Sequence, residues 1–320
     1  MIGDRTRHVS VVCNPRSGRP GGGAADARRR AIGAALAAHA VQASWFETTR
    51  ADPGHEATTR AVAAGADLVL TCGGDGTVMA CAAALLGTRV PLGIVPAGTG
   101  NIIATSLGLP TRVVDAIEVA LHGSRQHIDL GATGDARPFF SAGIGFSAAV
   151  VRDATPTLKS RTGMLAYLLS AGRHALDRPA GFRVWLDDRP PITRLAHGVL
   201  VGNFGEMMRR PLAQTGLDDS ALEIGILRVR PLLDLARPDR RRPPLVDWYQ
   251  AGRVRIECDR RQPTERDGDW HGASAQLEAA VLPRVLEVCV SGSVTLRAPR
   301  QTLSQLLVRD LGRIAGFRAA

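Results

Sequence analysis

Several residue types are scarce in this sequence, and each shortage excludes a class of protein. Lysine occurs once, at Lys159, and no glycine loop precedes it, so the GxxxxGK[ST] loop of Walker-type kinases is absent. The five cysteines are odd in number and form no CxxC pair, which argues against a disulfide framework or a zinc site and favours a reducing compartment. Aromatic residues make up only 4% of the chain, so a stacking platform for nucleic acid is not expected.

Long hydrophobic runs are missing as well. No uncharged apolar stretch reaches the ~18 residues that span a bilayer, and the N-terminal segment MIGDRTRHVS lacks the apolar core of a signal peptide. We therefore expect a cytoplasmic protein. Its 320 residues, 45% of them apolar, suffice for about two domains with sizeable cores. The net charge of +10 favours anionic partners: nucleic acid, nucleotides or acidic lipid headgroups.

Residues 1–133 alternate between two patterns. Short, apolar, β-prone runs are followed by alanine-rich stretches with helical spacing, which predicts an α/β domain whose parallel sheet is covered on both faces. The expected strands are His8–Cys13, Val41–Phe46, Asp67–Cys72 and Val90–Val95, and the expected helices are Ala24–Ala40, His55–Ala64, Val78–Leu86 and Val113–Leu121.

The pattern changes in residues 134–296, which predict a second, mostly antiparallel β domain. One helix is expected there, Met164–Ala175, which either covers the sheet or docks on a membrane. Residues 297–320 return to helical spacing, and this helix either packs back on the first domain or lies on a membrane as a basic amphipathic helix. The expected strands are Gly181–Leu186, Ala196–Asn203, Leu222–Val229, Gly252–Glu257 and Arg284–Val290.

Turn-forming residues follow three of the expected N-terminal strands. The strongest signal is Gly73–Thr77 (GGDGT), whose glycines allow close backbone approach just before a helix N-terminus that suits a phosphate. The alternative is a glycine-rich turn capped by Asp75. Asn14–Gly18 and Pro96–Asn101 hold the same position after their strands. Because ligands bind at the carboxyl edge of open α/β sheets, the three loops together predict a nucleotide site.

These loops, in this order and spacing, resemble the lipid kinase family of diacylglycerol kinases, sphingosine kinases and their bacterial relatives, which shares its nucleotide domain with NAD kinases and phosphofructokinases. The likeness extends through Phe139–Val150, Val199–Gly205, Leu217–Glu223 and Asp267–Asp269. It implies an ATP-dependent lipid kinase that uses Mg²⁺ and associates peripherally with an anionic membrane. The implied acceptor is the hydroxyl of diacylglycerol or a related membrane lipid.

The resemblance also implies roles for particular residues. Asp269, which closes a DGD triplet, or Asp75 of GGDG takes the hydroxyl proton as general base. Mg²⁺ is held by the Asp219 carboxylate and the main-chain carbonyls of Gly216 and Ala221. ATP is held by Asn14, Pro15, Arg16, Ser17, Gly18, Thr49, Gly73, Gly74, Asp75, Gly76, Thr77, Val78, Met79, Ala80 and Thr99.

Three departures from the family pattern leave alternatives open. Met79-Ala80 replaces a frequent Asn-Glu pair, the DGD triplet carries a shorter side chain than DGE, and Ser220 replaces a glycine of the LDDG turn. Both acidic segments also fit ordinary turns. An NAD kinase-like enzyme is disfavoured because the chain has no Asn-Glu dipeptide. A non-catalytic nucleotide- or lipid-binding regulator stays open, as does a homodimer.

Overall fold

The computed structural model describes residues 8–18, 24–153, 170, 173–174, 177–204, 216–228 and 246–292. Most of the predicted helix Met164–Ala175 and all of the predicted C-terminal helix, residues 297–320, lie outside the described residues. Within the described part, every helix is too short or too polar to cross a membrane.

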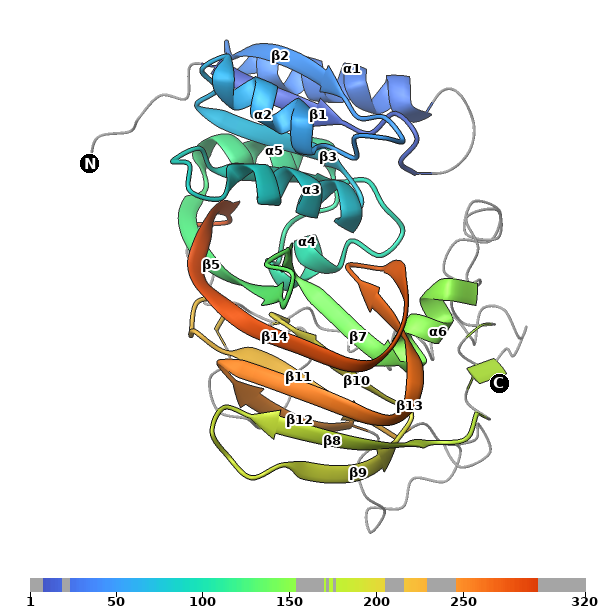
Figure 1. The fold of residues 1–320 in the computed structure, drawn as a ribbon. Coiled ribbons are helices and arrows are strands. Elements are labelled where there is room, and N and C mark those ends of the chain that lie inside the picture. Colours follow the sequence, from blue (N-terminus) through green and yellow to red (C-terminus); the bar gives the residue numbers. More distant parts are fainter. Residues whose placement is uncertain are drawn as a thin grey trace, which may run out of the picture.

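The N-terminal part is a parallel sheet with helices on both faces, as predicted (Figure 1). Its strands are β1 (His8–Cys13), β2 (Gln42–Glu47), β3 (Leu68–Gly73) and β4 (Leu92–Pro96), and its helices are α1 (Ala24–Ala38), α2 (His55–Ala63), α3 (Asp75–Leu85), α4 (Ile102–Ser106) and α5 (Val113–His122). The strand order is β2-β1-β3-β4. Helices α2, α3 and α4 pack on one face and α1 and α5 on the other, so the central strands are buried on both sides.

The second part is a mostly antiparallel sheet, again as predicted. Its elements are β7 (Ser141–Gly145), α6 (Phe146–Asp153), β8 (Ala180–Leu186), β9 (Ile192–Ala196), β10 (Gly198–Gly202), β11 (Leu222–Leu227), β12 (Val246–Ala251) and β13 (Arg253–Arg266). The early half of β13 pairs with β8 and its end pairs with β7. Alternate side chains of these strands form a core of their own that includes Phe182, Ile224 and Ile256.

One long strand joins the two sheets. β14 (Asp269–Val290) begins in a hairpin with β13 and ends beside β4, where Val288 pairs with Leu92 in parallel. β5 (Ser124–Thr133) runs antiparallel to β14 and also pairs with the short β6 (Pro138–Phe139). The chain therefore crosses to the second sheet along β5 and returns to the first along β14 (Figure 1).

Several details of the second part differ from the sequence-based expectation. The segment Gly252–Glu257 is only the start of a 14-residue strand, and Arg284–Val290 is only the end of a 22-residue strand. The expected strand Ala196–Asn203 is divided, because Ala196 ends β9 and β10 begins at Gly198. β5, β7, β9, β12 and α6 are not predicted, because they are short or mix polar with apolar residues.

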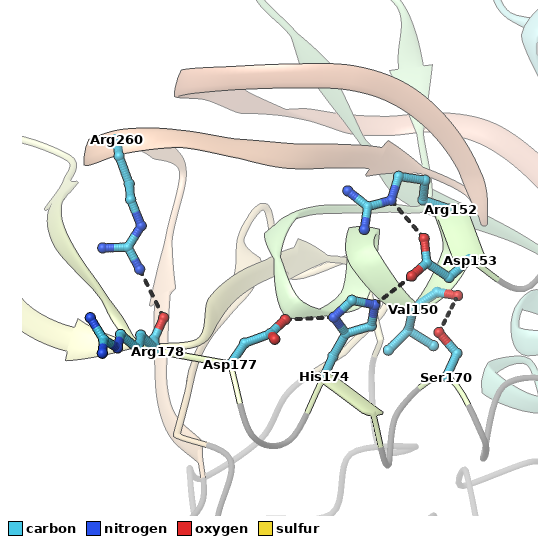
Figure 2. A network of polar contacts seen from close by, with 8 residues as sticks. All are labelled: Val150, Arg152, Asp153, Ser170, His174, Asp177, Arg178 and Arg260. Carbon is cyan, nitrogen blue, oxygen red and sulfur yellow. Dashed lines mark hydrogen bonds and ion pairs between the residues drawn. The ribbon is translucent and has the colours of Figure 1, made fainter.

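The buried side chain of His174 forms a hydrogen bond with Asp153 at the end of α6 (Figure 2). His174 lies between Asp153 and Asp177, with nitrogen–oxygen distances of 2.8 and 2.5 Å. Arg152 also contacts Asp153, and Arg152 together with His174 lowers the pKa of Asp153 to about 2. A polar cavity of about 110 Å³ adjoins this network, and the described residues that line it include none of those predicted to hold ATP or metal.

Candidate active site

The three predicted loops start from one hydrogen-bonded edge of the N-terminal sheet. Asn14 follows β1, Gly74 follows β3 and Ala97 follows β4. The Asn14 N–H donates to the Cys72 carbonyl at 2.9 Å, and the Ala97 N–H donates to the Gly73 carbonyl at 2.9 Å. The loops therefore leave the sheet side by side, as the parallel order of the strands requires.

Two of the loops touch through glycines. A Cβ atom added to Gly98 would lie 2.5 Å from the Gly74 Cα, and one added to Gly74 would lie 3.2 Å from the Gly98 Cα. Asn101 closes the later loop: its Oδ1 accepts the Gly98 N–H at 2.8 Å and its Nδ2 donates to the Gly98 carbonyl at 2.9 Å. The close approach of the two backbones therefore depends on the absence of side chains at Gly74 and Gly98.

Asn14 organises the first loop. Its Oδ1 accepts the Arg16 N–H at 2.9 Å, and its Nδ2 donates to Thr77 Oγ1 at 3.2 Å, which ties this loop to the first turn of α3. Arg28 from α1 donates to the Ser17 carbonyl at 3.2 Å and to its hydroxyl at 3.1 Å. The Arg16 side chain is exposed, in a position where it can meet an anion.

Asp75 begins α3 and links two of the loops. Its Oδ1 accepts the Ile103 N–H at 3.1 Å, so the carboxylate sits at the N-terminal end of α4. Burial raises the pKa of Asp75, while the backbone N–H groups around it act in the opposite direction. The contact holds Gly73–Thr77 against Pro96–Asn101.

Asp269 reaches the same place from the second sheet. It follows the Asp267-Gly268 turn of the β13–β14 hairpin, where φ is 51° and 80°. These positive values are typical of the tight hairpin turn that an Asp-Gly pair favours, so the hairpin interpretation is correct. Asp269 Oδ2 lies 3.8 Å from the position that a Cβ on Gly76 would occupy. An exposed carboxylate thus faces the first turn of α3.

The site residues predicted from the sequence do not include two other acidic residues of this hairpin, Asp267 and Glu265. Asp267 Oδ1 accepts the N–H groups of Phe140 and Ser141, both at 2.9 Å, and so fixes the hairpin on β7. Glu265 is only 6% exposed, and its Oε2 accepts a backbone N–H of the turn at 3.2 Å. Burial raises the pKa of each carboxyl group to about 7, and neighbouring carboxylates add to the effect. The only sequence signal is their spacing before Asp269.

The predicted metal residues share one turn. Asp219 accepts the Gly216 N–H through Oδ2 and the Ala221 N–H through Oδ1, both at 3.1 Å. Ser220 has a φ of 59°, the left-handed conformation for which a glycine is suited. Asp129 lies beside the turn and accepts the Ser220 N–H at 2.6 Å; burial, and then the charge of Asp129, raise the pKa of Asp219. Carboxylate and backbone oxygens with excess negative charge fit Mg²⁺.

The other residues predicted to bind ATP lie in different environments, some on loops and some in the core. Thr49 follows β2, where its Oγ1 accepts the Asp52 N–H at 3.0 Å. Thr99 is exposed on the loop after β4. Val78 and Met79 are buried in the core around α3, so their side chains do not point toward the loops. A methionine in place of the family's polar residue is therefore compatible with the fold at position 79.

The sequence matches a known protein family and several of its members. The family model for the diacylglycerol kinase catalytic domain matches residues 8–133. A protein of Chromohalobacter salexigens named "Probable lipid kinase YegS-like" is 30% identical over 240 residues, which cover 70% of this chain and 76% of that protein. A "Diacylglycerol kinase" of Mycobacterium tuberculosis is 34% identical over 186 residues, 56% of this chain and 59% of that protein.

A solved structure shares the fold of this chain, and the sequence matches show its family. A crystal structure of a diacylglycerol kinase from Bacillus anthracis is similar with a TM-score of 0.65 at 19% identity, over 89% of this chain and 97% of that one, which shows a shared fold. The chain belongs to the family of diacylglycerol kinase-type lipid kinases. It spans only part of some relatives, 38% of one from Synechocystis and 59% of the mycobacterial protein.

Proposed function

We propose that this protein is an ATP-dependent lipid kinase that phosphorylates the hydroxyl group of diacylglycerol or a related membrane lipid. The observation that carries the proposal is the position of Asp269, a carboxylate of the second sheet that faces the first turn of α3 where the loops meet. A phosphoryl donor on the loops and an acceptor hydroxyl beside Asp269 would be neighbours. Phosphoryl transfer depends mainly on such positioning and on charge neutralisation.

The loops supply what a triphosphate requires. The first N–H groups of α3 have no partner within the helix and carry the positive end of its dipole. At Gly76 the nearest atom to the position of an added Cβ is Asp269 Oδ2, at 3.8 Å, so phosphate oxygens can approach the backbone of this turn closely. Arg16 adds a positive charge that stabilises the negative charge on the transferred group.

Asp269 is the base in this proposal, and Asp75 is a positioning residue. One oxygen of Asp75 is already bonded to the Ile103 N–H, whereas Asp269 is exposed. As the acceptor oxygen attacks the γ-phosphorus, its proton passes to Asp269 and the bond between the γ-phosphorus and the ADP oxygen breaks.

Mg²⁺ would be held by the Asp219 carboxylate with the carbonyls of Gly216 and Ala221. When bound, it would neutralise the negative charge of this turn. Leu217 of the same turn and Ile103 of α4 belong to one hydrophobic core, so this core anchors both the turn and the helix after the third loop.

The acceptor lipid stays in the bilayer, so the enzyme would dock on an anionic membrane. The net charge of +10 supports this, because each arginine near an anionic surface contributes about 1 kcal/mol within a Debye length. Vesicle flotation is the measurement. Binding should require anionic lipid and weaken as salt rises, and equal binding to neutral vesicles would contradict electrostatic docking.

The activity is tested with γ-labelled ATP and a total lipid extract, with NAD as a parallel acceptor. Label in a phosphorylated lipid is expected, and it should be lost in Asp269→Asn. Label in NAD would instead indicate an NAD kinase. ATP binding without transfer to either acceptor would indicate a regulator.

A further inference from the structure

Two cysteines lie side by side directly beneath the nucleotide loops. Cys13 ends β1, Cys72 is the penultimate residue of β3, and the two are paired in register. Both side chains belong to the core on the α1 side of the sheet, so they point to the same face. Neighbouring strands lie about 4.8 Å apart, which is within the Cα separation of about 4.4–6.8 Å that a disulfide spans.

The two thiols are chemically unequal. A hydrogen bond from Cys72 lowers the pKa of the Cys13 thiol, and the guanidinium of Arg28 acts in the same direction against the effect of burial. The same hydrogen bond, followed by burial, raises the pKa of Cys72. Cys13 is 6% exposed and Cys72 fully buried. This arrangement makes Cys13 the reactive thiol and Cys72 its resolving partner.

We propose that Cys13 and Cys72 form an oxidisable dithiol, a site that reacts with hydrogen peroxide to give an intrachain disulfide. The Cys13 thiolate attacks one peroxide oxygen, the O–O bond breaks, and a sulfenic acid forms as hydroxide leaves and takes up a proton. The Cys72 sulfur then attacks the sulfenic sulfur, its proton joins the departing hydroxyl, and water leaves. The two thiols lose two electrons and two protons, and the peroxide becomes two waters.

The disulfide would act on the nucleotide loops. The Asn14 N–H is bonded to the Cys72 carbonyl at 2.9 Å, so the disulfide would cross-link the two strand ends at the point where the first two loops leave the sheet. Arg28, whose charge acts on Cys13, also donates to the Ser17 carbonyl at 3.2 Å, so this side chain connects the dithiol to the first loop.

Oxidation should therefore weaken ATP binding, an effect that rests on the proposed function. Linkage makes this coupling reciprocal: ATP must disfavour the disulfide by the same factor by which the disulfide disfavours ATP. We expect a loss of ATP affinity of about tenfold, within the usual range for coupled sites.

The experiment oxidises the reduced, full-length protein with hydrogen peroxide, blocks remaining thiols with N-ethylmaleimide and maps the peptides without reduction. The peptide with Cys13 should be joined to the peptide with Cys72, and a reductant should separate them. In Cys72→Ser, which keeps a hydrogen-bond donor beside Cys13 but has no resolving sulfur, Cys13 should stop at the sulfenic acid, which dimedone traps. Cys258→Ala is the matched control: Cys258 is more exposed, but burial and then Asp259 raise its pKa to about 12.

The outcomes separate the parts of the proposal. No Cys13–Cys72 link in the oxidised wild type, or a dimedone adduct on Cys258 rather than Cys13, overturns the dithiol. A link with unchanged ATP affinity overturns its coupling to the loops. If the reduced protein fails to bind ATP, the proposed function fails, and the peptide map still decides whether the dithiol exists.

Discussion

The carboxylate of Asp75 accepts a hydrogen bond from the backbone N–H of Ile103 at 3.1 Å, and this contact joins the loop after β3 to the helix that follows β4. It explains how an acidic residue is compatible with the phosphate binding proposed for this loop. The charge of Asp75 faces backbone N–H groups at the start of α4, which favour the ionised form. Asp75 is therefore bonded to the start of α4 whereas Asp269 is exposed, although both lie near the first turn of α3.

Asp269→Asn should lower kcat about 10²–10⁴-fold with little change in ATP affinity, because it removes the proton acceptor and keeps the shape of the side chain. Asp75→Asn retains an oxygen for the Ile103 N–H and should have a much smaller effect on kcat. Steady-state kinetics at saturating ATP measure both. The reverse pattern would assign the base to Asp75.

Gly98→Ala should destabilise the protein by about 1–3 kcal/mol, because its methyl group would meet the Gly74 Cα at 2.5 Å. Gly76→Ala is the matched variant. Its methyl group would lie 3.8 Å from Asp269 Oδ2, an ordinary contact, so it should fold normally yet weaken ATP binding by occupying the phosphate approach. Thermal unfolding and ATP titration distinguish the two variants. Unchanged ATP affinity in folded Gly76→Ala would contradict the loop assignment.

Ser220→Gly should stabilise the protein by about 1 kcal/mol, because glycine adopts the φ of 59° without the steric cost that a side chain meets there. The backbone N–H that donates to Asp129 is unchanged by the substitution. Ser220→Ala is the control and should not gain stability. Urea unfolding gives the order of stability of the wild type and the two variants. A Ser220→Gly variant less stable than the wild type would contradict backbone strain at Ser220.

Stability should fall as pH rises from about 4.5 to about 7, because the folded state raises the pKa of Glu265 and Asp267 to about 7 from ordinary values of 4.5 and 3.8. Within that window the folded protein retains protons that the unfolded chain has released. Glu265→Gln cannot ionise, so its stability should depend less on pH and exceed wild type near pH 8 by on the order of 2 kcal/mol. Urea titrations across this pH range give the dependence of the unfolding free energy on pH for both proteins. Equal dependence would contradict the raised pKa of Glu265.

The sequence predicts the first sheet and its loops well because the signals there are local. The strands are apolar runs. Gly73–Thr77 has three glycines in five residues, a composition that few structures other than a tight turn between a strand and a helix require. Glu265 illustrates the opposite case, since its importance comes from burial beneath a hairpin and from contacts with residues distant in the sequence. The length of β14 could not be predicted either. Its residues are mostly exposed at the start and buried at the end, so no single alternation of polar and apolar residues runs through the strand.

The pairing of Val288 with Leu92 has a consequence for biosynthesis. During translation β4 leaves the ribosome long before β14, so the nascent N-terminal sheet carries an open strand edge until the return strand is made. Closing so long a loop is slow compared with forming local contacts. A fragment limited to residues 8–133, the range that the family model matches, would keep that edge open, so its expression alone should give an aggregation-prone product, whereas the chain extended through Val290 can cover the edge.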